Sequence, residues 1–547
     1  MEYFREAFTD HERSILERYF TSVDGPVFAL IDLPEVVRTA LFARYSRSAK
    51  SMRRLFLDEF AGRLDETSNL QDPGEPAAGG DVDTARASGL FDRIFTEYGD
   101  DSVAQLGGAH VACEQASNIL TKILERGRLA SYLEQSTRYI YFDKPLGGAY
   151  RYGVPAEIAA RGMTQQYRET MDMLFRTYSE LVPPLSDHYG SLVPRPAQVT
   201  DVAWRASIRA RVCDDLRGLL PASTLSNVGI YASGQAFEAL IIKMRSHPLA
   251  EVKAYAEMLL TELRKVIPFF VKRVDIPDRG RRWSAYFAEI DERMKAASAF
   301  LEQHSGAEER PEVLLTEWDP AAEVKLAAAA LYGYSQLPDD QLLSIAQGMT
   351  GDARRDLIRT YCGDRKNRRH RPGRAMERAV YRFDVVAPYS VFRDLQRHRL
   401  LTIEWQTLST LHGYDVPAGV EAIGAVEPWH RAMGEAAGLH EQLQRSAGRE
   451  AAQYAVPLAW KIRFNWHVNA RELFHILELR TQSGGDPAYR RICQEIHRLI
   501  REQAGHGAIA DAMSFVDTSD YELGRLDGER RAAERLAVLE TQRQGPG

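Results

Sequence analysis

Two arginine-rich segments, one in each half of the chain, carry the residue types best suited to binding an anionic ligand. The first begins at Arg126-Gly-Arg128 and the second at Arg397-His398-Arg399, and in both a serine or threonine follows three residues after the second arginine. A Gln-Ser or Gln-Thr pair closes the pattern, with its hydroxyl residue ten positions after the first arginine in each copy. Guanidinium groups are planar, permanently charged donors that match phosphate oxygens. A frame shared by two halves of one chain indicates an internal duplication.

A second pair of markers repeats downstream of the first. Arg245 lies 24 residues after Pro221, Arg480 lies 23 residues after Pro457, and each arginine closes an apolar run with helical spacing. In the second half this predicted helix opens at Asn469, eleven residues before Arg480, so one amide and one guanidinium would share a face. The alternative interpretation is an arginine that extends from a helix end into solvent.

These residues together resemble the motifs of the flavin-dependent thymidylate synthases. The second arginine segment is similar to the Arg-His-Arg sequence of that family, and the run that ends at Arg480 is similar to its Asn-x-Arg and Leu-x-Leu-Arg helix. Glu377 opens a strand-like segment that resembles the one leading into the family motif. Because the resemblance covers most of residues 90–260 and 313–515, we interpret the chain as a tandem pair of such modules.

The resemblance implies reductive methylation of dUMP to dTMP, with FAD as cofactor, methylenetetrahydrofolate and NADPH as co-substrates, and no protein nucleophile. A cation at the uracil ring would stabilise negative charge as the ring becomes a carbon nucleophile, and the candidates are Arg480 first and Arg245 second. The nucleotide would be bound by Glu134, Gln135, Ser136, Thr137, Arg138 and Arg217. FAD would be bound by Ser102, Arg126, Arg128, Glu377, Arg397, His398, Arg399, Asn469, Arg471 and His475. The resemblance implies no metal ligand, and it implies a homodimer that rebuilds a four-module assembly.

Each half departs from the family pattern in a different place. The first half has Gly234, Ala236 and Leu240 where the second has Asn469, Arg471 and His475. The second half has Trp405, Thr407 and Ser409 where the family has Glu, Ser and Arg, and Gln453 where the first half keeps Arg217. The first half has therefore weakened its flavin side and the second its phosphate side. Two interpretations stay open: simple decay, or a composite site in which the second half serves FAD and the first half serves dUMP.

Two other functions fit the same motifs. A protein with decayed motifs could bind a nucleotide or flavin without catalysis, and a related flavin-dependent transferase could act on another pyrimidine nucleotide. The basic run 365–374 is interpreted as a solvated loop, with a role at the flavin pyrophosphate as the functional alternative and nucleic-acid binding behind it.

Composition places few further limits on function. The chain has 547 residues, 44% of them apolar and 27% charged, which is ordinary for a globular protein with a large core. A net charge of -6 provides no general attraction to nucleic acid or anionic membranes, and no apolar run is long enough to span a bilayer. The four cysteines are widely separated and form no Cys-x-x-Cys pair. We therefore expect a cytoplasmic protein that binds neither nucleic acid nor membranes.

The expected fold class is α+β, with two related modules that are mainly helical and have a small sheet each. We predict an N-terminal module over 1–302 with a mobile loop at 67–88, a linker over 303–312, a C-terminal module over 313–525 and a charged tail over 526–547. Alternating apolar and polar residues predict a strand that ends at Pro388.

Overall fold

A computed structural model describes residues 6–45, 48, 50–61, 105–197, 199–303, 306, 308–526, 528 and 530. The chain forms two compact units, the first containing residues 1–114, 129–134 and 227–304 and the second containing residues 115–128, 135–226 and 305–547. The loop expected at 67–88, the candidate residue Ser102 and most of the expected tail lie outside the described residues. No helix in the described ranges combines the length and hydropathy needed to cross a membrane.

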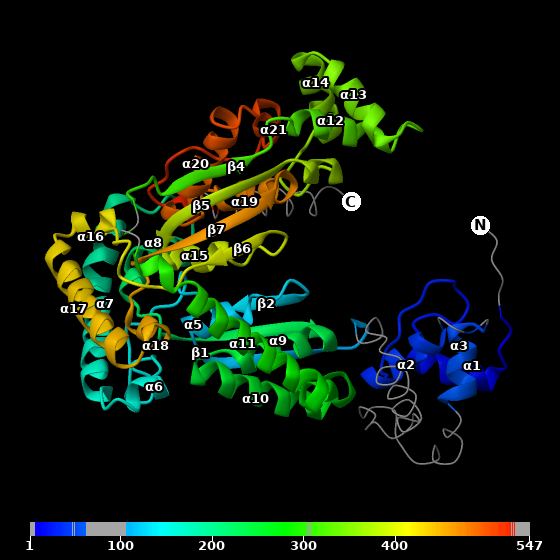
Figure 1. Ribbon diagram of the computed structural model, residues 1–547, viewed down its shortest axis with the longest axis horizontal. Helices are drawn as coiled ribbons and strands as arrows, with labels where there is room; N and C mark the ends of the chain where they lie inside the picture. The colour runs from blue at the N-terminus through cyan, green and yellow to red at the C-terminus, as the bar shows by residue number, and fades with distance from the viewer. Residues whose placement is uncertain are drawn as a thin grey trace. The chain divides into compact units, whose positions relative to one another are not determined.

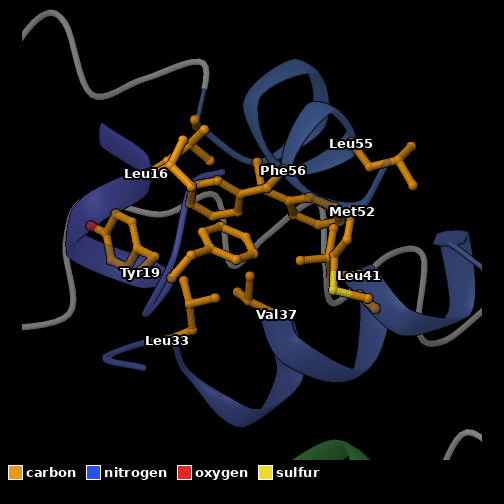
Figure 2. Packing of buried hydrophobic residues seen from close by; sticks show 13 residues of the cluster. Leu16, Tyr19, Leu33, Val37, Leu41, Met52, Leu55 and Phe56 are labelled. Atoms are coloured by element: carbon orange, nitrogen blue, oxygen red, sulfur yellow. The ribbon is translucent and has the colours of Figure 1, made fainter. Parts of the chain in front are cut away.

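The N-terminal segment of the first unit is a group of three short helices, α1 (Asp10–Tyr19), α2 (Glu35–Tyr45) and α3 (Met52–Glu59). Helix α1 begins with a capping box, in which Thr9 and Glu12 each accept a hydrogen bond from the other's backbone N–H. Figure 2 shows the apolar side chains of the three helices, among them Leu16, Val37 and Phe56, turned toward one another. These helices therefore share a core of their own.

The rest of the first unit is built on a three-stranded sheet in the order β1–β3–β2. Its strands are β1 (Gly108–Ser117), β2 (Ala130–Glu134) and β3 (Leu225–Ser233). Strands β2 and β3 are antiparallel, with Ala130 opposite Ala232, and β3 alternates buried and exposed residues as a sheet with one covered face requires. The accompanying helices, which lie on one side of the sheet in Figure 1, are α9 (Gly234–Ser246), α10 (Ala250–Val266) and α11 (Arg282–Ala297), with η4 (Pro268–Asp275), η5 (Pro277–Arg281) and η6 (Ala299–Gln303) between and after them.

The second unit contains a four-stranded sheet in the order β4–β5–β7–β6. Its strands are β4 (Val313–Trp318), β5 (Val380–Pro388), β6 (Thr402–Trp405) and β7 (Lys461–Asn469). Every neighbouring pair is antiparallel, and Phe383 of β5 lies opposite Trp466 of β7, with both side chains buried. The predicted strand ending at Pro388 is confirmed as β5.

Helices make up most of the second unit. Those from the first half of the sequence are α5 (Asn118–Leu124), α6 (Ala156–Ala159), α7 (Thr164–Leu192), α8 (Asp201–Leu216) and η3 (Arg217–Leu219). Those from the second half are α12 (Ala322–Tyr332), α13 (Asp339–Gly348), α14 (Gly351–Cys362), η7 (Arg374–Arg378), α15 (Tyr389–Leu395), α16 (Ala418–Ala422), α17 (Val426–Ser446), α18 (Arg449–Ala452), η8 (Gln453–Ala455), α19 (Ala470–Arg480), α20 (Pro487–Glu502) and α21 (Gly507–Ala512). Figure 1 shows α7 beside α17, so segments from both halves build one compact body.

The order of elements repeats along the chain. The series β1, α5, β2, α7, α8, η3, β3, α9, α10 in the first half corresponds to β5, α15, β6, α17, α18, η8, β7, α19, α20 in the second. The two sheets have the same topology once β4 is set aside, because β3 and β7 each lie between the other two strands. The expected fold class, two related and mainly helical modules with a small sheet each, is confirmed.

The two repeats meet within the second unit around matching prolines. Pro221 and Pro457, which occupy the same place in the repeat, form an antiparallel bridge with each other. The Ala222 N–H donates to the Val456 carbonyl at 2.8 Å, and at the matching positions the Leu458 N–H donates to the Leu220 carbonyl at 2.9 Å. This exchange of equivalent bonds is the mark of a two-fold interface, here between two halves of one chain.

Candidate active site

The second arginine segment is held at the end of a short buried helix. Helix α15 follows directly from Pro388, where β5 ends, and its residues are buried from Tyr389 to Leu395. The chain then turns toward β6, so that His398 is buried while Arg397 and Arg399 are more accessible. The local order of strand, helix and turn therefore presents two guanidinium groups beside one buried imidazole.

Helix α19 carries the candidate residues Arg471, His475 and Arg480, and a fourth candidate, Asn469, is its N-cap. The Asn469 side chain caps the helix by accepting a hydrogen bond from the Glu472 N–H at 2.9 Å, so its carbonyl oxygen serves the helix rather than a ligand. At the other end, the Arg480 Nε donates to His398 Nε2 at 3.0 Å, and an Arg480 Nη donates to the Asp394 carbonyl at 2.5 Å. The helix thereby connects to the second arginine segment.

The basic run 365–374 reaches the same helix. A guanidinium nitrogen of Arg371 lies 2.9 Å from His475 Nδ1, and Arg471 donates to the Pro372 carbonyl and to Glu377. Burial, followed by the charges of Arg371 and its neighbours, lowers the pKa of His475 to about 4. His475 therefore stays neutral at physiological pH. The charges of Arg371 and Arg471 then exceed that of Glu377, and a positive net charge suits an anionic group such as a diphosphate.

The side chains of His398, Glu472 and His475 also cluster closely enough to meet one metal ion, with ligand atoms within 4.8 Å of one another. Their hydrogen bonds oppose that use. Each imidazole turns one nitrogen to an arginine donor, Arg480 for His398 and Arg371 for His475. A metal-bound imidazole carries its proton on the other nitrogen, which would place N–H against N–H in both cases. The residues fit a metal ion poorly.

Glu472 gives this cluster a pH dependence that can be measured. Burial raises the pKa of Glu472 to about 7, from an ordinary value of 4.5, against the opposing charges of Arg371, Arg471 and Arg399. The folded protein therefore holds the proton more tightly than the unfolded chain. The resulting stability is fully present below pH 4.5 and is lost as pH rises through about 7.

We expect the Glu472→Gln variant to lose less stability than the wild type between about pH 5 and pH 8, by about 2–3 kcal/mol. The amide is uncharged throughout, so only the wild type must ionise a buried carboxyl over that range. Denaturant unfolding of both proteins at the two pH values measures the difference. Parallel pH profiles would contradict the raised pKa.

The first-half segment predicted to bind the nucleotide lies against second-half residues of the same unit. Arg138 forms a two-pronged ion pair with Asp214, at 2.6 and 2.8 Å, and also donates to the Tyr489 hydroxyl at 3.0 Å. Ser136 accepts from the Arg138 N–H, and Thr137 accepts from Arg393 at 3.4 Å. Arg138 is nearly buried, so its charge is already matched by a carboxylate.

Arg217 is enclosed even more completely. Its side chain is 2% exposed and forms ion pairs with Asp394 at 3.0 Å and Asp486 at 2.7 Å. Two of its guanidinium nitrogens are thus bonded to carboxylates, and its predicted contact with the nucleotide stays a prediction. The buried Nε of Arg217 has no hydrogen-bond partner among the described residues.

Asp394 is the point where the two halves converge. One of its carboxylate oxygens contacts Arg217 and the other contacts Arg397 at 3.3 Å, while its backbone carbonyl accepts from Arg480. Arg480 also lies over the ring of Tyr489, at 5.4 Å from its centroid. The candidate residues Arg138, Arg217, Arg397, His398 and Arg480 thus form one connected cluster from both halves. Sequence reasoning missed both Asp394 and Asp486 as partners of Arg217.

The first arginine segment is used differently from the second. Arg128 donates to the Leu401 carbonyl at 3.0 Å and to the Thr402 hydroxyl at 3.2 Å, both in the second half. The Arg126 guanidinium lies over the ring of Trp405, at 4.9 Å. These contacts fasten the first segment to β6. They also explain the tryptophan, which stands where the family pattern has Glu.

Helix α9, the first-half counterpart of α19, has no free space beside its first residue. The structure sets Ser233 rather than Gly234 at the position of Asn469, because each residue caps the helix that follows it. A Cβ at Gly234, the first residue of α9, would clash with the Phe270 Cβ. At the other end of α9, Arg245 forms ion pairs with Glu257 at 2.7 Å and Asp275 at 2.8 Å. The candidate Glu134 lies in β2 of this same unit and is buried. The flavin-side losses of the first half therefore coincide with a space that Phe270 fills.

Comparisons with known proteins show which family the two halves of the chain resemble. The family described as thymidylate synthase complementing protein matches residues 48–269 and again 313–505. A UPF0159 protein of Chlamydia muridarum is 36% identical over 96% of this chain and 98% of its own length. A UPF0159 protein of Thermoplasma acidophilum is 29% identical over 90% and 98% of the two chains. A flavin-dependent thymidylate synthase of Clostridium tetani is 24% identical over 33% of this chain and 68% of its own.

Proposed function

Because this chain belongs to the thymidylate synthase complementing protein family, we propose that it is a flavin-dependent thymidylate synthase with one composite site. It would methylate dUMP to dTMP with methylenetetrahydrofolate as the carbon donor and NADPH as the reductant. The observation that carries this proposal is the connected cluster in which second-half Arg397, His398 and Arg480 meet first-half Arg138 and Arg217.

The residues around α19 fit a flavin diphosphate. Arg371, Arg399 and Arg471 all lie close enough to influence the charge of Glu472, and among the described residues Arg399 forms no ion pair. We assign FAD binding to Arg399, Arg471 and His475, with Arg371 as an added donor from the basic run. FAD, when bound, would supply the redox chemistry of the reaction. The residues assigned above would hold it.

We assign the uracil-facing cation to Arg480 rather than Arg245. Within the described part of the chain Arg480 has no carboxylate partner, and its guanidinium is oriented by His398, the Asp394 carbonyl and the Tyr489 ring. The pKa of His398 is held well below its ordinary range, chiefly by burial, so the imidazole stays a neutral acceptor. A fixed cation with donors to spare can stabilise charge that develops on the uracil ring.

The nucleotide would lie along the segment from Gln135 to Arg138. Ser136 and the backbone of this segment supply the direct contacts in this proposal. In this proposal Arg138 and Arg217 act by holding Asp214, Asp394 and Asp486 in place through the ion pairs described above. The role of Glu134 at the ribose is carried over from the family resemblance alone.

The spectrum of the purified protein tests the proposed function directly. A yellow protein whose flavin bands are bleached by NADPH, and which then forms dTMP from dUMP and methylenetetrahydrofolate, is the expected result. A yellow protein that forms no dTMP would favour a non-catalytic binding protein or a transferase for another pyrimidine nucleotide. A colourless protein that takes up no added FAD would contradict the proposal.

The two arginine segments should differ in their effect on flavin content. We expect Arg399→Ala to weaken FAD binding about ten- to a hundredfold, the cost of one charge-assisted contact. The matched variant Arg128→Ala should keep its flavin, because Arg128 is already bonded to Leu401 and Thr402. Titration of each apoprotein with FAD, followed by fluorescence quenching, gives the two dissociation constants. Equal losses would refute the division of labour between the halves.

A further inference from the structure

The residues that follow α21 form a strap across the loop between α19 and α20. Thr481, at the end of α19, accepts from the Asp517 N–H at 2.9 Å, and Arg490 of α20 donates to the Ser519 carbonyl at 2.7 Å. We call residues 514–526 the C-terminal strap. Both of its leucines are buried. The strap lies beyond the part of the chain that matches the family, so the family resemblance assigns it no role.

The end of the strap lies beside the candidate nucleotide segment. Gly524 is so close to the loop that a Cβ at this position would clash with the Ser483 carbonyl oxygen. The guanidinium of the next residue, Arg525, lies over the ring of Tyr139, at 4.5 Å from its centroid. The Arg138 guanidinium contacts the same ring, at 5.8 Å. The strap therefore brings a second guanidinium to the end of this segment.

The proposed nucleotide site needs a source of positive charge. Carboxylates offset the charges of Arg138 and Arg217 in the ion pairs described above. The direct contacts assigned to Ser136 and the backbone are uncharged. A nucleotide phosphate carries about two negative charges at neutral pH, and hydrogen bonds from a charged donor are about twice as strong as those from a neutral one. A further cation near this segment would supply the missing charge.

On the basis of the proposed function, with dUMP along the candidate segment, we propose that Arg525 binds the nucleotide phosphate. Arg525 is half-buried and Tyr139 is 43% exposed, so a ligand can reach the pair. A guanidinium held over an aromatic ring can still offer its in-plane N–H groups to phosphate oxygens. The competing role is structural: the contact with Tyr139 would only fasten the strap.

Calorimetric titration of the full-length protein with dUMP and with deoxyuridine separates these two roles, because deoxyuridine lacks only the phosphate. We expect Arg525→Ala to weaken dUMP binding about ten- to a hundredfold, the effect of losing one charge-assisted contact. Its affinity for deoxyuridine should equal that of the wild type. The control is Arg530→Ala, which removes an exposed arginine beyond the strap and should change neither affinity.

A pair of glycine variants tests the position of Arg525 rather than its presence. Gly524→Ala keeps the arginine, but its Cβ would meet the Ser483 carbonyl, so the strap must shift. We expect this variant to lose about tenfold in dUMP affinity and to bind deoxyuridine as the wild type does. In Gly528→Ala the new Cβ has no described atom within 4 Å, so this control should bind both compounds normally. Circular dichroism would show that all four variants are folded.

Equal dUMP affinity in Arg525→Ala and the wild type would overturn the phosphate role of Arg525. An equal loss of dUMP and deoxyuridine affinity would also overturn it, since that is the pattern of a strap that only supports the site. In both cases a wild type that binds dUMP leaves the proposed function standing. A wild type that binds neither compound would overturn the proposed function together with the role of Arg525.

Discussion

Replacing Arg480 with lysine is expected to lower dTMP formation by about a hundred- to a thousandfold, the usual effect of removing one preorganised donor at a developing negative charge. Lysine keeps the positive charge but loses the planar set of donors. Arg480 uses that set to bond His398 through Nε and the Asp394 carbonyl through one Nη. A lysine ammonium cannot make both contacts and also face the substrate.

The matched control is Arg245→Lys at the equivalent position of the first half. Arg245 is already neutralised by Glu257 and Asp275, so we expect this variant to lose less than about threefold in turnover. Single-turnover measurements with flavin-loaded protein separate the chemical step from flavin binding. A larger loss in Arg245→Lys than in Arg480→Lys would move the uracil-facing cation to the first half and reverse the proposed assignment.

Local patterns in the sequence predicted the elements that carry the motifs. The alternation of Tyr381, Phe383 and Val385 with polar residues is visible without any partner strand, and so is the apolar spacing that leads to Arg480. The internal duplication could also be predicted from the sequence, because the two copies preserve the spacing between matching residues. The first two features can be detected from local periodicity, and the duplication can be detected by comparing one half of the chain with the other.

The use made of each arginine could not be predicted in the same way. Arg217 lies 177 residues from Asp394 and 269 from Asp486, and no local pattern marks either aspartate as its partner. The filling of the Gly234 position by Phe270 is likewise a packing event between residues far apart in sequence. Residue type alone made these arginines resemble phosphate ligands, whereas burial and ion pairing decide which of them can reach a ligand.

Removal of the Arg217 side chain should destabilise the second unit strongly. We expect Arg217→Ala to lower the free energy of unfolding by about 3–5 kcal/mol, because it leaves Asp394 and Asp486 buried without their shared cation. The melting temperature should fall by about 5 °C for a unit of this size. Thermal unfolding followed by circular dichroism measures the shift.

The repeat supplies its own control for this prediction, since Gln453 occupies the position equivalent to Arg217. Its amide oxygen accepts from the Leu408 N–H at 3.0 Å and its amide nitrogen donates to the Glu450 carbonyl at 3.1 Å, so Gln453→Ala should cost only about 1–2 kcal/mol. The dUMP affinity of folded Arg217→Ala separates the two roles that an arginine can have at this position. If Arg217 holds Asp394 and Asp486, the melting temperature falls as predicted above. The affinity for dUMP then falls only because the neighbouring residues are less well positioned. If it binds phosphate, affinity falls about ten- to a hundredfold while melting without nucleotide hardly changes. That second pattern would show that Arg217 contacts the nucleotide directly, and it would imply that the buried ion pairs open when dUMP binds.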